Sequence, residues 1–117
     1  MRRYGVVIVA LVVLLGAAFA VPMRQASADD GAKKLFNAQC STCHGIDGHG
    51  QTTAGKRAGV KDWTTGTTLR ALSDADIQKM IREGRKDASG KETMPPLKTL
   101  NDDQMNALVA YVRSLQK

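Results

Sequence analysis

The chain has 117 residues, a formal net charge of +6, 43% hydrophobic residues and 4% aromatic residues. A chain of this length forms one domain, and its basic residues do not make a stripe with interleaved aromatic side chains, which argues against nucleic-acid binding. The sequence has no Ser/His/Asp arrangement and no glycine-rich phosphate loop, so we do not expect an enzyme.

The first 28 residues have the layout of a secretory signal. Two arginines precede an apolar stretch at residues 6–21, and the small residues at positions 26–28 supply a cleavage site. Sixteen residues span about 24 Å as a helix, which is short of the roughly 30 Å hydrocarbon core of a bilayer. We therefore expect export to the periplasm with removal of residues 1–28. The alternative is an uncleaved membrane anchor.

Residues 29–117 form the expected domain. Without the three arginines that precede residue 29, 14 basic side chains stand against 11 acidic ones, a net charge of +3. A chain this small buries only a modest share of its surface and often needs a staple. A large, mostly apolar cofactor would complete its core, and we expect a monomer.

A first helix is predicted from about Asp30. Ala32, Leu35 and Phe36 have the i, i+3, i+4 spacing of one helix face. We expect this helix to run directly into the cysteine-containing segment that follows.

The segment Cys40-x-x-Cys43-His44 carries the most specific chemistry of the chain. It holds both cysteines and one of the two histidines. Cysteines three apart on a helical turn can form thioethers to the two vinyl groups of a haem, and the adjacent histidine can bind the iron. The single motif predicts one covalently attached haem c per chain.

The two cysteines could instead serve as a redox dithiol, as zinc ligands or as a disulfide. A redox dithiol needs a βαβ setting, which the sequence does not indicate. A structural zinc site usually takes four ligands, and only His49 is available as the fourth, which would crowd all four into one short segment. A disulfide leaves the adjacent histidine unexplained.

Residues 45–68 are rich in glycine and threonine and show no helical periodicity. We expect them to form a loop around one edge of the haem. A loop this long is unusual in a small domain, and the cofactor would account for it.

Two further helices are predicted from their capping residues. Ser73 is a good N-cap. Ile77, Met80 and Ile81 are expected to form a buried apolar stripe, and Gly84 ends the helix. The residues from 85 to 93 are polar and are expected to form a loop.

The last helix is expected to begin after Asn101, with Gln104 completing a capping box. Its apolar face is formed by Met105, Leu108, Val109, Val112 and Leu115. Three helices and no strands predict an all-α fold wrapped around one haem.

Met94 is the expected second ligand of the iron. Met80 and Met105 occupy apolar helix positions that packing explains, whereas Met94 precedes two prolines and is held in an extended conformation. His49 is only five residues from His44, so it would have to reach round the porphyrin edge, and we expect it to be a solvated loop residue. Methionine with histidine is the ligand pair expected for cytochromes c.

Taken together, these motifs resemble those of the class I cytochromes c, of the small bacterial periplasmic kind. The resemblance covers about residues 30–117 and depends on Gly31, Phe36, the Cys40–His44 motif, residues 45–50, Met94-Pro95 and residues 108–113. It implies a periplasmic carrier that transfers one electron between redox partners, and not an enzyme. A haem subunit or membrane-tethered domain of a larger oxidoreductase is the alternative, and a gas sensor or peroxidase would need an open sixth iron position.

The resemblance also implies roles for individual residues. The first and last helices should cross near Gly31, with Phe36 and Tyr111 packed beside the crossing. Family members often have a proline after the motif whose carbonyl accepts the Nδ1 proton of the histidine. This chain has no proline between residues 45 and 91, so we expect another backbone carbonyl to orient His44.

Two expectations concern residues around the haem edge. Trp63 either donates its indole N–H to a haem propionate or packs against the porphyrin edge with its N–H in water. Basic residues flanking the motif are expected to steer weak docking of partners or to be ordinary solvated charges: Lys33, Lys34, Lys56, Arg57 and Lys61.

Overall fold

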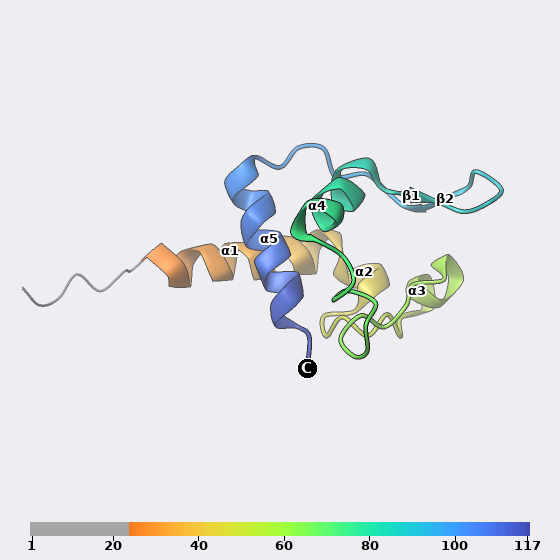
Figure 1. Ribbon diagram of the computed structural model, residues 1–117, viewed down its shortest axis with the longest axis horizontal. Helices are drawn as coiled ribbons and strands as arrows, with labels where there is room; N and C mark the ends of the chain where they lie inside the picture. Colours follow the sequence, from red (N-terminus) through yellow and green to blue (C-terminus); the bar gives the residue numbers. More distant parts are fainter. Residues whose placement is uncertain (1–23) are drawn as a thin grey trace, which may run out of the picture.

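The computed structural model describes residues 24–117, which include five helices and one short β-hairpin (Figure 1). In chain order these are α1 (Arg24–Gln39), α2 (Ser41–His44), α3 (Thr53–Ala58), α4 (Asp74–Glu83), β1 (Arg85–Lys86), β2 (Glu92–Met94) and α5 (Asp102–Ser114). The predicted signal or anchor lies largely in residues 1–23, outside the described residues. No helix within residues 24–117 has the length and hydrophobicity that a membrane span requires.

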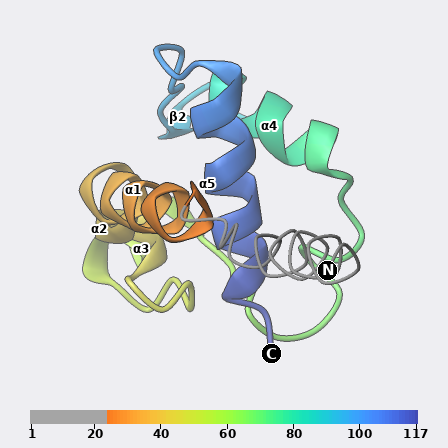
Figure 2. The same ribbon diagram turned by 90° about the vertical axis from the view of Figure 1, so that its left-hand side faces the viewer.

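The largest helices build the core. Helix α5 contacts both α1 and α4 and lies between them when viewed along α1 (Figure 2). The buried apolar cluster comes from these three helices and from the segments that precede α4 and α5: Phe36, Leu69, Ile77, Ile81, Leu100, Met105, Leu108, Val109 and Val112. The predicted apolar face of the last helix is therefore confirmed, with Leu115 partly buried against the cluster.

The predicted caps of the last two long helices are confirmed. The Ser73 hydroxyl accepts from the backbone N–H of Asp76, and the Asp76 carboxylate accepts from that of Ser73. Asn101 and Gln104 form the same reciprocal pair at the start of α5. Gly84 ends α4 with φ of 71°. Local chemistry thus sets these helix ends, as the sequence indicates.

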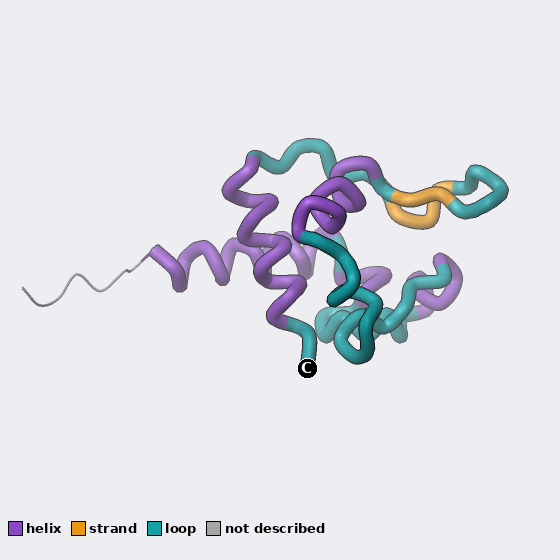
Figure 3. The backbone as a smooth tube through the Cα atoms, in the orientation of Figure 1, coloured by secondary structure: helices purple, strands orange, loops and turns teal. Residues whose placement is uncertain are grey.

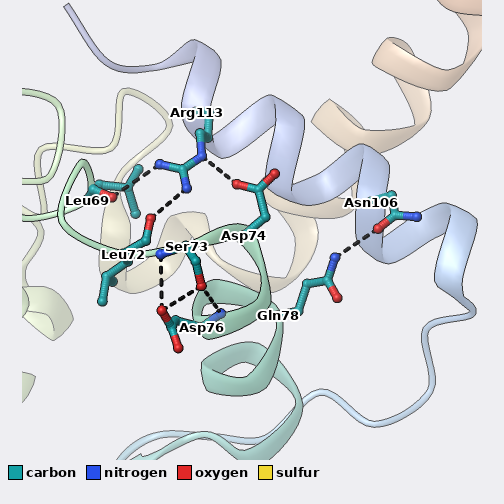
Figure 4. A network of polar contacts seen from close by, with 8 residues as sticks. All are labelled: Leu69, Leu72, Ser73, Asp74, Asp76, Gln78, Asn106 and Arg113. Carbon is teal, nitrogen blue, oxygen red and sulfur yellow. Dashed lines mark hydrogen bonds and ion pairs between the residues drawn. The ribbon is translucent and has the colours of Figure 1, made fainter.

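Polar contacts fasten α4 to α5 (Figure 4). The Arg113 guanidinium donates to the Asp74 carboxylate at 2.7 Å and to the carbonyl oxygens of Leu72 and Leu69 at 2.7 and 3.2 Å. A second contact joins the same two helices, where the side-chain amide nitrogen of Gln78 donates to the side-chain oxygen of Asn106 at 2.8 Å. One arginine therefore satisfies the carbonyl groups of the turn that leads into α4 while pairing with the first residue of that helix.

Helices α1 and α5 pack together as expected at Phe36 and Tyr111 but not at Gly31. Phe36 and Tyr111 do pack together, with ring centroids 5.3 Å apart. Gly31 is exposed, however, and a Cβ atom there would meet nothing within 4 Å. The expectation of a close approach at Gly31 is wrong. The buried small residue of this helix is its neighbour Ala32.

Helix α1 also begins earlier than predicted. It spans Arg24–Gln39, so the backbone is already helical across residues 26–28, where cleavage is expected. The apolar spacing of Ala32, Leu35 and Phe36 marks only the part of the helix that packs on the core.

Two further predictions are wrong at the level of secondary structure (Figure 3). The segment 45–68 is not a continuous loop, because Thr52 caps the six-residue helix α3 and Gly59, in the left-handed region, ends it. The chain also contains strands, since β1 and β2 pair antiparallel where a polar loop was expected. Both elements are too short to show a hydrophobic period, which is why periodicity did not reveal them.

Candidate haem site

The two cysteines and His44 lie on one helical turn. The backbone N–H of His44 donates to the carbonyl of Cys40 at 2.9 Å, and that of Gly45 donates to the carbonyl of Ser41 at 2.8 Å. The N–H of Cys40 in turn donates to the carbonyl of Phe36. The motif therefore continues directly from the C-terminal end of α1, as predicted, and its three functional side chains are half-buried.

Burial shifts the pKa values of the Cys40 thiol and the His44 imidazole. It is the main cause that raises the pKa of the Cys40 thiol to about 11, with a smaller contribution from neighbouring Cys43. It also lowers the pKa of His44 to about 4. At neutral pH the imidazole is therefore uncharged and has a lone pair for a metal ion. No disulfide joins the two cysteines, so both sulfur atoms are available for other bonds.

The ring of His44 stacks on the indole of Trp63. The ring centroids are 4.1 Å apart and the planes differ by 22°. Nδ1 of His44 is buried and has no hydrogen-bond partner within residues 24–117. The expectation that a backbone carbonyl accepts from this nitrogen is therefore wrong for this structure.

The surroundings of Trp63 exclude one of its two predicted roles. Its Nε1 is buried without a hydrogen-bond partner, so the interpretation with the N–H in water is wrong. The indole is also 6.3 Å from the Phe36 ring, centroid to centroid, and fills the space where a Cβ of Gly48 would lie. Trp63 therefore packs against the motif and the aromatic core. Donation to a haem propionate stays a prediction.

His49 is not a free solvated residue as expected. Its Nδ1 lies 2.8 Å from the Asp62 carboxylate and 3.0 Å from the Thr64 hydroxyl. Thr64 also donates its backbone N–H and its hydroxyl to Asp62. The hydrogen bonds from His49 first, and then from Thr64, lower the pKa of Asp62 to about 2. This group joins the two ends of the segment that surrounds α3.

Glycines let that segment fold tightly against the motif. A Cβ at Gly55, in α3, would collide with the carbonyl of Cys43 and lie 2.7 Å from that of Gly50. The Thr52 hydroxyl donates to the same Cys43 carbonyl at 3.0 Å. The glycine and threonine content of this segment thus has a structural reason, which is close backbone packing beneath the cysteine turn.

Met94 is the last residue of β2, at the base of the hairpin. It pairs with Arg85, and the N–H of Leu97 donates to the carbonyl of Ile81 at 2.8 Å. These contacts bind the chain on both sides of Pro95-Pro96 to the end of α4. The Met94 side chain is half-buried and packs against the same apolar cluster as Cys40 and Trp63.

The other candidate ligands differ from Met94 in their surroundings. Met105 is 1% exposed within the core, as predicted. Met80 is only half-buried and is not part of the buried cluster, so its placement in a buried stripe with Ile77 and Ile81 is wrong. His49 is engaged by Asp62 and Thr64.

Comparison with known proteins settles the family. The family model described as cytochrome c matches residues 29–116. The chain belongs to the cytochrome c family. The chain is 31% identical over 84 residues to cytochrome c-554(547) of Halothiobacillus neapolitanus, covering 72% of this chain and 92% of that protein. It is also similar to the solved c-type cytochrome KustC0563, with 33% identity and a TM-score of 0.64, covering 74% of this chain and 98% of the other.

The mostly helical architecture is the cytochrome c fold, and the predicted class is confirmed. The cofactor of this cytochrome c is haem c, attached covalently, with Cys40 and Cys43 in position for the two thioethers. The residues present fit that group, because they offer two thiols and an uncharged imidazole on one turn beside an apolar cluster. The family's function is haem-based electron transfer between redox partners.

Sequence reasoning missed two features of the site. One is the stack of Trp63 on His44, across 19 positions of sequence. The other is the group formed by His49, Asp62 and Thr64. Neither has a local signal, since both depend on how the segment around α3 folds back on the motif. The polar stretch Asp62-Trp63-Thr64 offers only the composition of such contacts and does not reveal their partners.

Proposed function

We propose that this cytochrome c is an exported carrier of single electrons, with His44 and Met94 as the axial ligands of the haem iron. The observation that carries the ligand assignment is the anchoring of the Met94 segment. Strand pairing, the Leu97–Ile81 hydrogen bond and the two prolines hold this half-buried thioether outside any helix. Met80 and Met105 lack such a setting because both lie within helices.

The haem supplies one-electron chemistry, and the chain determines how that chemistry is used. His44, uncharged at neutral pH, provides a nitrogen ligand. The soft thioether of Met94 favours ferrous iron and therefore raises the reduction potential. Because the thioether would fill the sixth position, it would also exclude small molecules from the iron, which suits a carrier and not a sensor or peroxidase.

Substitution of the three methionines tests the ligand assignment. Met94→Ala should remove the weak near-infrared sulfur-to-iron absorption of the ferric protein, allow carbon monoxide to bind the ferrous protein, and lower the reduction potential. Met80→Ala and Met105→Ala are matched controls that should retain the absorption band. Persistence of the band in Met94→Ala, or its loss in either control, would show that the assignment is wrong.

Electron exchange requires that partners approach the haem. The five basic residues expected to steer them are all exposed: Lys33, Lys34, Lys56, Arg57 and Lys61. Transient redox complexes are small and steered by charge, so electron-transfer rates with a partner should change with ionic strength. Rates that are independent of salt would remove docking by charge from the proposal while leaving the axial ligands untouched.

The proposed carrier is exported from the cytoplasm. A basic start, an apolar stretch and small residues at 26–28 support a signal peptide over residues 1–28 and a monomeric periplasmic product that begins at Asp29. N-terminal sequencing of the protein from the periplasmic fraction tests this. Recovery only from membranes, with Arg2 still present, would instead favour a tethered domain of a larger oxidoreductase.

A further inference from the structure

We propose that Trp63 is the residue that positions His44, and that its stacked indole takes the place of a hydrogen-bond acceptor at Nδ1. This inference rests on the proposed ligation of iron by His44. In most metal-binding histidines the nitrogen that does not bind the metal donates to a carbonyl, a carboxylate or water, and this bond fixes the ring orientation. Here that nitrogen is buried without a partner within residues 24–117.

The geometry of the stack suits this role. With centroids 4.1 Å apart and planes 22° from parallel, the indole covers one face of the imidazole. A flat surface against the ring opposes rotation about the bond between Nε2 and the iron, because any turn out of the plane would drive the imidazole into the indole.

Trp63 is itself fixed from both sides along the chain. Asp62 before it is held by His49 and Thr64, and Thr64 after it is 1% exposed, with its carbonyl accepting from the N–H of Lys117 at 2.9 Å. At the indole edge, Gly48 has no Cβ, and one placed there would lie 2.5 Å from Nε1. The stack is therefore built into the fold and is not a contact of a free side chain.

The missing hydrogen bond has an electronic consequence. A bond from Nδ1 to an acceptor makes an imidazole a stronger donor to its metal, and a stronger donor stabilises ferric iron. By covering the ring and excluding water, Trp63 keeps His44 a weaker donor. The tryptophan should therefore favour the ferrous state as well as hold the ligand plane.

Replacing the indole in the haem-containing protein tests the inference. Trp63→Leu should change the g values of the ferric low-spin signal and the spread of the shifted haem-methyl resonances, since both depend on the orientation of the ligand plane. It should also lower the reduction potential as water reaches Nδ1. Trp63→Phe retains a flat ring and should restore signals close to those of the wild type. Trp63→Met, which is about as large as leucine but unbranched and likewise has no flat face, should behave like Trp63→Leu.

Tyr111→Leu is the matched control. Tyr111 belongs to the same aromatic group through Phe36 but does not stack on His44. Both leucine variants should lower the midpoint of thermal unfolding, whereas only the change at position 63 should alter the ligand signals. Wild-type signals in both Trp63→Leu and Trp63→Met would overturn the inference, as would the same altered signals in Tyr111→Leu.

The wild-type protein separates this inference from the proposed function. If its ferric spectrum lacks a histidine-ligated low-spin signal, the ligation by His44 is wrong and the role of Trp63 falls with it. If that signal is present but does not respond at position 63, only the positioning role is wrong.

Discussion

Gly84 connects α4 to the hairpin that carries Met94. Its φ is 71°, and a Cβ atom there would collide with the carbonyl oxygen of Met94 and lie 2.8 Å from the nitrogen of Pro96. We expect Gly84→Ala to displace the Met94 segment and weaken the sulfur-to-iron absorption. The positive φ alone should cost about 1–3 kcal/mol of the free energy of unfolding.

Gly90→Ala is the control for that change. Gly90 lies in the turn between the strands with φ of 84°, yet a Cβ there would meet nothing within 4 Å. It should show a comparable loss of stability on denaturation with an unchanged absorption band. A full-strength band in Gly84→Ala would show that the Met94 segment does not depend on the glycine.

Asp62 should make the loop around α3 sensitive to acid. Its pKa in the folded protein, about 2, lies below the unfolded value near 3.9. The group therefore stabilises the fold above about pH 4, and this contribution disappears as the pH falls from about 4 to about 2. Asp62→Asn should flatten that part of the pH dependence. Thermal unfolding of both proteins between pH 2 and pH 6 measures the difference.

Asp103→Asn serves as the comparison for the acid effect. Asp103 is exposed on the first turn of α5 and makes no side-chain hydrogen bond or ion pair with residues 24–117. It should keep the wild-type slope through this range. Equal flattening in both variants would place the acid sensitivity elsewhere in the molecule.

The predictability of individual residues depended on where their partners lie in the sequence. Cys40, Cys43 and His44 are neighbours on one turn, so their spacing alone predicts the site. His49 and Trp63 act through contacts 13 to 19 positions away, and their roles follow only from the folded loop. The prolines that follow Met94 predict its extended backbone. The sequence does not predict that Gly84 leaves room for the carbonyl of Met94.

The elements of the fold divide in the same manner. Helices α4 and α5 were predicted closely because their caps are local and their apolar faces repeat. Helix α3 was missed because it packs through a glycine and backbone atoms and not through an apolar face. The hairpin was missed because its residues are polar and its strands span only two and three residues.

Helix α5 should depend on Met105 for its attachment to the core. This side chain is 1% exposed and belongs to the buried cluster. Met105→Ala should lower the free energy of unfolding by about 2–5 kcal/mol, because it leaves a cavity as well as losing buried surface. Denaturant titration of the haem-containing protein measures this loss. Met80→Ala, at a half-buried position, should cost less, and a larger loss there would contradict the assignment of the core.

At the scale of the whole molecule, we expect the haem cofactor to act as a component of the core as well. The aromatic residues are few, with two Phe, two Tyr and one Trp in the entire chain, and much of the apolar cluster is aliphatic. A chain of this size has a small core and therefore depends on an added stabilising group such as a covalently bound cofactor. Loss of the thioethers should therefore affect the entire fold and not only the iron site.

Acidified organic extraction followed by mass measurement should find one haem on the intact polypeptide. The double variant Cys40→Ala with Cys43→Ala should release its haem under the same conditions and unfold at a lower temperature. Single replacements should keep the haem through the remaining thioether. Haem extracted from the unaltered protein would contradict covalent attachment.

The stack between Trp63 and His44 gives the molecule a built-in optical reporter. The chain has one tryptophan, and the structure places it in contact with His44, which lies on the same helical turn as both cysteines. A fluorophore so near a strongly absorbing porphyrin loses its excitation to it, so the native protein should be almost dark at tryptophan emission wavelengths. Emission should rise when the segment around α3 leaves the motif. Stopped-flow fluorescence can therefore time the opening of that segment without a label.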